Sequence, residues 1–138
     1  MMTTDIPGAV SLWIGVSPSR EALEGYVGMD YTKGDTSRLS QFADDFGTDF
    51  YDEDFMDTSF HDMPIRSLAQ LLRRCSYAEL LTPKFVELCG ELLPIEAISV
   101  VLLYDFRHEG TPGHYGPWNS AVKLRYLGHI KVPTPWPD

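Results

Sequence analysis

The apolar run at residues 98–106, which reads ISVVLLYDF, constrains the fold more than any other segment of the chain. It is rich in β-branched residues, and apolar side chains occupy nearly every position. Such a run leaves no face of a strand for water, and it is far too short to span a bilayer. The sequence therefore predicts a central strand that other parts of the chain cover on both faces.

Two further segments alternate with the period of two that strands have. At 10–16 the apolar side chains share one face, and Trp13 lies on the other, where a strand tryptophan usually packs against helices. At 122–132 an apolar face alternates with a mainly basic one, as in an antiparallel sheet with one exposed face. The glycine- and proline-rich residues 107–119 predict a hairpin loop before this strand.

Apolar stripes at helical spacing, with capping residues beside them, predict the helices. The capping box at 76–79 predicts a short extra turn, and residues 48–64 give only a short strand or turn near Phe50 and a helical turn near Asp54. Four helices are predicted in this way. The first begins after Ser17 and ends at Gly28, and the second begins at Thr36 or Ser37 and ends at Gly47. The third spans 65–75, and the fourth begins at Thr82-Pro83 and ends before Pro94.

These elements predict an α+β fold: a small, mostly antiparallel sheet of three to four strands with helices packed on one face, in two layers. The length fits one domain over residues 1–138, with its core at 9–132 and a proline-rich tail at 133–138. Trp118 and Trp136, in the loop and the tail, are candidate contact residues.

The charge of the chain narrows the class of partner. Twenty acidic residues against eleven basic ones leave a formal net charge of −9 at pH 7. Phosphate backbones and anionic membranes repel such a chain, which argues against nucleic-acid and membrane binding. The same field steers a cationic protein toward it. We therefore expect a protein partner with a basic surface, although many soluble bacterial proteins are acidic without such a role.

The number of cysteines and the first residues of the chain indicate the cellular compartment in which the protein is expected. Cys75 and Cys89 both occupy apolar positions of helical patterns, where a free thiol behaves as a small hydrophobic group. Two cysteines make no disulfide framework. Residues 1–7 lack the basic start and the apolar stretch of a signal peptide. These features predict a reduced, cytoplasmic protein.

The densest local feature is an acidic segment with interleaved aromatic residues at 44–62. It holds eight carboxylates within nineteen residues, and no lysine or arginine occurs between Arg38 and Arg66. One interpretation is a patch that meets a partner's cations and offers aromatic anchors; the other is a solvated loop with its aromatic side chains in the core. The predicted partner-binding residues are Asp44, Asp45, Asp49, Phe50, Tyr51, Asp52, Glu53, Asp54, Phe55 and Asp57.

A metal site is the third interpretation of this segment, with ligands from Asp49, Asp52, Asp54 and Asp57. A calcium loop beginning at Asp52 would need glycine where Asp57 stands and glutamate where Met63 stands, so that pattern fails. The chain also lacks HExxH, GxSxG and the phosphate-binding glycine loops. We therefore expect no enzyme activity, no cofactor and no bound metal.

Several short motifs resemble those of a bacterial immunity protein family from polymorphic toxin systems, the family numbered twenty-two in that series. The motifs are SLWIG at 11–15, SQFADDFG at 40–47, YDEDF at 51–55 and LYDF at 103–106, and the resemblance spans about residues 9–106. It implies an α+β protein, encoded beside a toxin gene, that neutralises the toxin by direct binding. By position the matching residues are Trp13, Phe42, Asp45, Phe46, Tyr51, Asp52, Asp54 and Phe55.

Charge and resemblance lead to one hypothesis: an immunity protein whose acidic segment blocks the basic active-site region of a cognate toxin. The resemblance adds that toxins of such systems are often nucleases, and nucleases carry basic grooves. A small metal-dependent hydrolase that uses the acid cluster, and an interaction module whose partner is not a toxin, are the alternatives.

Overall fold

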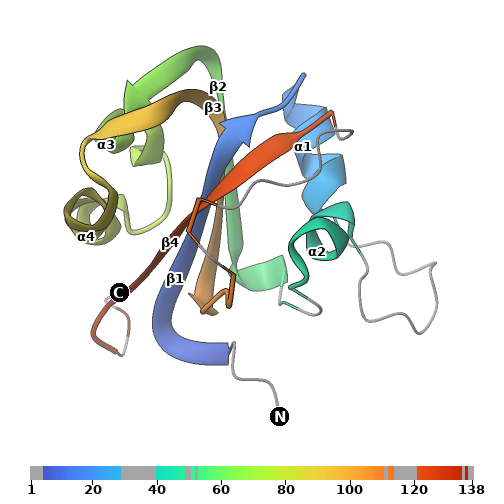
Figure 1. The fold of residues 1–138 in the computed structure, drawn as a ribbon. Helices are drawn as coiled ribbons and strands as arrows, with labels where there is room; N and C mark the ends of the chain where they lie inside the picture. The colour runs from blue at the N-terminus through green and yellow to red at the C-terminus, as the bar shows by residue number, and fades with distance from the viewer. Residues whose placement is uncertain are drawn as a thin grey trace, which may run out of the picture.

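The fold is built around a four-stranded sheet of order β2-β3-β1-β4, in which every neighbouring pair is antiparallel (Figure 1). The computed structural model describes residues 5–28, 40–48, 51, 53–110, 112–113, 121–134 and 136. The strands are β1 (Asp5–Val16), β2 (Met56–Ser67), β3 (Leu92–Phe106) and β4 (Lys123–Lys131). The predicted strand at 98–106 is therefore an inner strand, as expected.

The described helices are α1 (Arg20–Val27), α2 (Gln41–Phe46), α3 (Leu68–Leu72) and α4 (Ala78–Cys89), with a 3-10 turn η2 (Glu53–Phe55) before β2. Serine side chains begin the first two: Ser19 Oγ accepts from the Ala22 amide, and Ser40 Oγ accepts from the Ala43 amide. Such caps satisfy amides that the first turn leaves unpaired. The first helix thus begins two residues later than its Ser17-Pro18 signal predicted, because Ser19 supplies the cap.

Helices cover both faces of the sheet. On one face, alternate side chains of β1 such as Leu12 pack against Leu72 of α3 and Phe85 of α4. On the other face, Trp13 packs with Phe42 of α2 and with residues of α1, as predicted for a strand tryptophan. The α+β fold with a small antiparallel sheet is confirmed. The helices form two outer layers where we expected one, because the central strands are apolar on both faces (Figure 1).

The predicted helix at 65–75 was wrong in its first turn, and the unclassified segment before it contains a strand. Ile65 pairs with Ala97 and Ser67 with Leu92 in the β2–β3 ladder, so α3 begins only at Leu68. The buried positions of β2 include Ser59 and His61. Polar side chains at buried sites hide the hydrophobic alternation by which a strand is recognised.

Two connections also differ from their predictions. The segment after β3 does not close a hairpin, because β1 lies between β3 and β4 in the sheet. The extra turn at 76–79 and the helix expected from Thr82-Pro83 form one helix, α4, which runs through Pro83. Tertiary packing of Leu81 and Phe85 on the sheet outweighs the backbone hydrogen bond that a proline removes.

Candidate functional site

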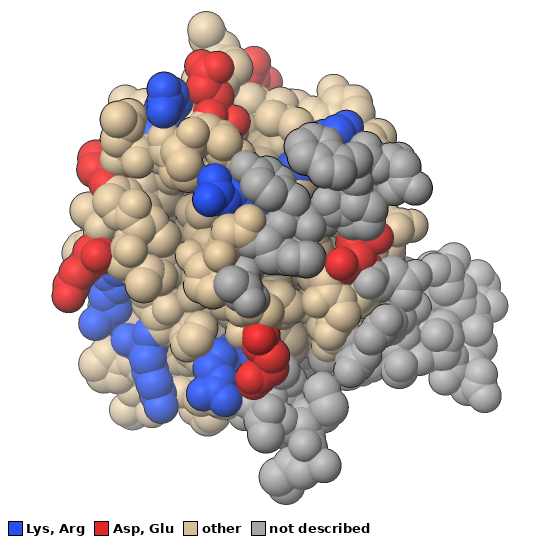
Figure 2. Space-filling view, in the orientation of Figure 1, with Lys and Arg blue, Asp and Glu red and all other residues tan. Residues whose placement is uncertain are grey.

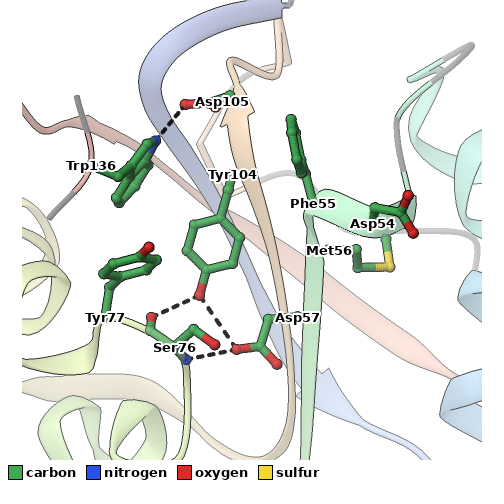
Figure 3. Close-up of a pocket in the computed structure, with 9 residues that line it drawn as sticks. All are labelled: Asp54, Phe55, Met56, Asp57, Ser76, Tyr77, Tyr104, Asp105 and Trp136. Carbon is green, nitrogen blue, oxygen red and sulfur yellow. Dashed lines mark hydrogen bonds between the residues drawn. The ribbon is translucent and has the colours of Figure 1, made fainter. Parts of the chain in front are cut away.

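An open pocket of about 360 Å³ lies where η2, the start of β2, the end of β3, the α3–α4 connection and the tail meet (Figure 3). Its charged lining residues are all acidic: Asp54, Asp57 and Asp105. Its aromatic lining residues come from four separate parts of the chain: Phe55, Tyr77, Tyr104 and Trp136. The pocket thus combines negative charge with aromatic surface.

Strand pairing places Asp57 and Tyr104 together. Asp57 pairs with Leu102 in the β2–β3 ladder, and Tyr104 lies two residues beyond Leu102 on the same face of β3. The Tyr104 hydroxyl donates to the Ser76 carbonyl at 2.8 Å and approaches Oδ2 of Asp57 at 3.4 Å. Burial, followed by the nearby Asp57 carboxylate, raises the pKa of Tyr104, so the phenol stays protonated and remains a donor.

Asp57 also orders the end of the α3–α4 connection, just before α4. Its Oδ2 accepts from the Ser76 amide at 2.8 Å, the same oxygen that faces the Tyr104 hydroxyl (Figure 3). The next residue, Tyr77, adopts a left-handed backbone with φ of 61° and leads into α4. Its ring is turned toward Trp136, and the two centroids are 4.8 Å apart.

Asp105 joins the tail to the sheet. It has a left-handed backbone with φ of 55°, and its Oδ1 accepts both the Gly8 amide and the Trp136 indole N–H, each at 2.8 Å. Asp tolerates this backbone region better than most residues because its short polar side chain bonds locally. The Trp136 ring then lies edge-on to Tyr104, with the centroids 5.7 Å apart.

Three of the predicted partner-binding residues, Asp54, Phe55 and Asp57, line this pocket together. Phe55 is 48% exposed, so its ring is accessible at the edge of the pocket. The remaining described side chains of the predicted set lie elsewhere.

Asp45 and Tyr51 make their contacts within the layer formed by α1 and α2. Asp45 accepts from the Tyr26 hydroxyl at 2.7 Å and from the Gln41 side chain at 2.8 Å. Tyr51 is 1% exposed, and its hydroxyl donates to the Val27 carbonyl at 2.7 Å, so its side chain belongs to the core. Burial, with Asp45 second, raises the pKa of Tyr26. The acidic segment therefore contributes to two different layers.

The other five predicted residues fall outside the part that can be assessed. Residues Asp49, Phe50 and Asp52 lie outside the described residues, as do the side chains of Asp44 and Glu53. On the face shown in Figure 2, the described Asp and Glu side chains are interspersed with Lys and Arg. They form no continuous acidic patch on that face. Negative charge is locally concentrated at the pocket, by its three aspartates.

Neither thiol forms a disulfide: Cys75 is buried and Cys89 is partly buried, and burial raises the pKa of both. Within the described ranges, no three His, Cys, Asp or Glu side chains converge as metal ligands would. In the same ranges, no helix is long and apolar enough to cross a bilayer.

Of the residues around the pocket, Trp136 was a predicted contact residue, whereas Tyr77, Tyr104 and Asp105 were not predicted as parts of a site. Tyr104 and Asp105 belong to the LYDF motif at 103–106. Two polar residues directly after a buried apolar run were the signal in the sequence that could have indicated a site. Tyr77 carries no such signal, because only the fold brings it to the pocket.

The fold and the pocket define a small α+β protein with an open pocket lined by acidic and aromatic side chains. The chain belongs to the Immunity protein 22 family, whose model matches residues 10–132. This match confirms the resemblance and extends it through β4. Comparisons with curated proteins and with solved structures gave no match.

Proposed function

We propose that this immunity protein binds a cognate toxin directly and neutralises it, and that the toxin presents a basic surface, such as that of a nuclease. Family membership carries the proposal, because an immunity protein acts by holding its toxin. The net charge of −9 supports a cationic partner, since opposite charges speed the encounter of two proteins.

We place the contact at the pocket and the acidic segment that enters it. Asp54, Phe55 and Asp57 lie at one end of the sheet, where an exposed aromatic side chain stands beside carboxylates. Interfaces draw most of their binding energy from such central anchors surrounded by polar groups. A partner seated here would bury Phe55 and neutralise the aspartates.

Co-expression with the toxin encoded beside this gene tests the function, with growth rescue and pull-down as readouts. The wild-type chain should restore growth and retain the toxin. Reversing Asp49, Asp52, Glu53 and Asp57 to lysine should abolish both. The matched control reverses four exposed helical glutamates, Glu21, Glu24, Glu79 and Glu87, to lysine, and it should keep rescue.

Two results count against the proposal. Failure of the wild-type chain to bind the neighbouring toxin rejects neutralisation by direct binding. Equal rescue by the two quadruple variants shows that the contact lies elsewhere on the protein.

The metal-dependent hydrolase is separated from this proposal by calorimetric titration. Its ligands would be Asp49, Asp52, Asp54 and Asp57, so Mg²⁺, Mn²⁺ or Ca²⁺ should then bind stoichiometrically and lose affinity in the reversed variant. A toxin-binding protein should show no stoichiometric binding of any of the three ions, and so no saturable heat of binding.

A further inference from the structure

We propose that the pocket lined by Asp57, Tyr104 and Trp136 is a receptacle for one arginine side chain of the toxin. This inference rests on the proposed toxin-binding function and names the chemical group that the site recognises. A guanidinium group is planar, permanently charged and able to stack on aromatic rings while its N–H groups bond to carboxylates.

The charge of the lining favours a cation. Among the lining residues that the structure describes, Asp54, Asp57 and Asp105 carry all the formal charge, and none is a lysine or arginine. Negative charge beside an opening attracts a cation to it.

The aromatic side chains favour a planar cation over a compact one. Tyr77, Tyr104 and Trp136 form a contiguous cluster, with centroid separations of 4.8, 5.7 and 6.2 Å. Phe55 stands across Tyr104 from Trp136 (Figure 3). A cation within about 6 Å of such ring centroids is attracted by their faces, tryptophan most strongly, and arginine uses this contact more often than lysine.

The carboxylates are already oriented. Within the described part of the chain, both hydrogen bonds of Asp57 end on Oδ2, from the Ser76 amide and the Tyr104 hydroxyl, which leaves Oδ1 with its acceptor capacity. Likewise both bonds of Asp105 end on Oδ1, from the Gly8 amide and the Trp136 indole. Groups fixed before binding lose little conformational entropy when a ligand arrives.

The size of the pocket suits a side chain better than a whole ligand. A volume of about 360 Å³ is near the lower end of small-molecule sites, roughly 300–1,000 Å³, and the opening is wide. An arginine side chain enters such an opening while its backbone stays in the partner's surface. Room then remains for bridging water at the acidic rim.

The first test uses an isolated arginine group and needs no toxin. N-acetyl-arginine amide is titrated into the full chain while the indole N–H signal of Trp136 is followed by NMR, assigned with Trp136→Phe. N-acetyl-citrulline amide is the neutral, isosteric control, and N-acetyl-lysine amide tests planarity. We expect saturable arginine binding at roughly millimolar Kd, about tenfold weaker lysine binding and no saturation by citrulline.

Variants then locate the binding. Asp57→Asn removes a charge while keeping shape and an acceptor for the Ser76 amide, and Trp136→Leu removes the aromatic surface. Each should weaken arginine binding about five- to tenfold. Because Trp136→Leu has no indole, its binding is followed through the backbone amide signal of Ser76, which donates to Asp57 in the pocket. The control is Glu87→Gln, the same change of charge about 15 Å along α4 from Tyr77, and it should leave Kd unchanged. Equal response of the Trp136 signal to arginine and citrulline overturns the proposal.

The second test uses the toxin encoded beside the gene. Asp57→Asn and Trp136→Leu should each weaken toxin binding tenfold or more, mainly through faster dissociation, while Glu87→Gln should not. If wild type neither binds nor rescues, the proposed function fails. If wild type binds and the pocket variants, shown to be folded by circular dichroism, bind equally well, the function stands and the arginine receptacle is rejected.

Discussion

The indole N–H of Trp136 donates to Oδ1 of Asp105 at 2.8 Å, and the same oxygen accepts the amide of Gly8. One carboxylate oxygen therefore joins the start of β1, the end of β3 and the tail. Because Trp136 also packs on Tyr77 and Tyr104, this bond holds one wall of the pocket in place.

Asp105 should be sensitive to the chemistry of its replacement. Asp105→Ala removes the shared acceptor and puts a Cβ without local hydrogen bonds at φ of 55°, so we expect a loss of about 2 kcal/mol in the free energy of unfolding. Asp105→Asn keeps an acceptor and tolerates the left-handed backbone, so it should lose less than about 1 kcal/mol. Urea unfolding measures both, and equal losses would show that the acceptor does not matter.

Trp13 should tolerate loss of its N–H but not of its ring. It is fully buried, with Phe42, Tyr126 and His108 ring centroids at 4.9, 5.0 and 5.2 Å. Its Nε1 has no hydrogen-bond partner among the described residues. We expect Trp13→Ala to cost about 3–5 kcal/mol, as large core truncations do, and Trp13→Phe about 1–2 kcal/mol.

Thermal unfolding and urea titration of the two Trp13 variants measure these costs. A phenylalanine variant as unstable as the alanine one would contradict this order, because it would show that a smaller aromatic ring cannot replace the indole in the core.

Gly15 and Gly25 should respond to alanine in opposite directions. A Cβ on Gly15 would lie 1.9 Å from the Lys123 carbonyl oxygen, because β4 pairs closely with β1 there. Gly15→Ala must push the strands apart, which should cost about 3 kcal/mol. A Cβ on Gly25, in α1, meets nothing within 4 Å, so Gly25→Ala should stabilise the protein by about 0.5–1 kcal/mol.

The midpoint of urea unfolding, compared at constant slope, reports both glycine substitutions. Destabilisation by Gly25→Ala would contradict the open surroundings of this residue, and a neutral Gly15→Ala would contradict the close approach of β4.

Stability should fall in alkaline solution through Cys75. Burial raises the pKa of this thiol from 9.0 to about 11, with Ser59 and Asp57 as smaller influences of opposite sign. The folded state therefore favours the neutral thiol: its contribution is complete below pH 9 and is lost as the pH rises toward 11. Over that window wild type should lose about 2 kcal/mol more than Cys75→Ala.

Urea unfolding at pH 7.5, 9, 10 and 11 gives the comparison, and the constant cost of the alanine cavity cancels in the pH-dependent difference. Parallel pH profiles for wild type and Cys75→Ala would show that the thiol does not couple to folding.

Local patterns were sufficient for much of the fold. The continuous apolar run of β3 and the alternation of β1 are properties of neighbouring residues, so they are visible without tertiary structure. The terminal glycine of α2 is local in the same sense, whereas its start was predicted at Thr36 or Ser37 and the cap is Ser40. The strand β2 escaped detection because Ser59 and His61 fill its buried positions, and their burial depends on partners that are distant in the chain, such as Cys75 and Leu71.

The sequence by itself determined that this is an acidic α+β protein with apolar inner strands, because composition and short-range periodicity encode those properties. Only the tertiary structure decided which residues share a site. Strand pairing sets Asp57 beside Tyr104, the α3–α4 connection supplies Tyr77, and the bond to Asp105 brings Trp136. These contacts join segments far apart in the chain, and no local pattern carries information about such long-range juxtaposition.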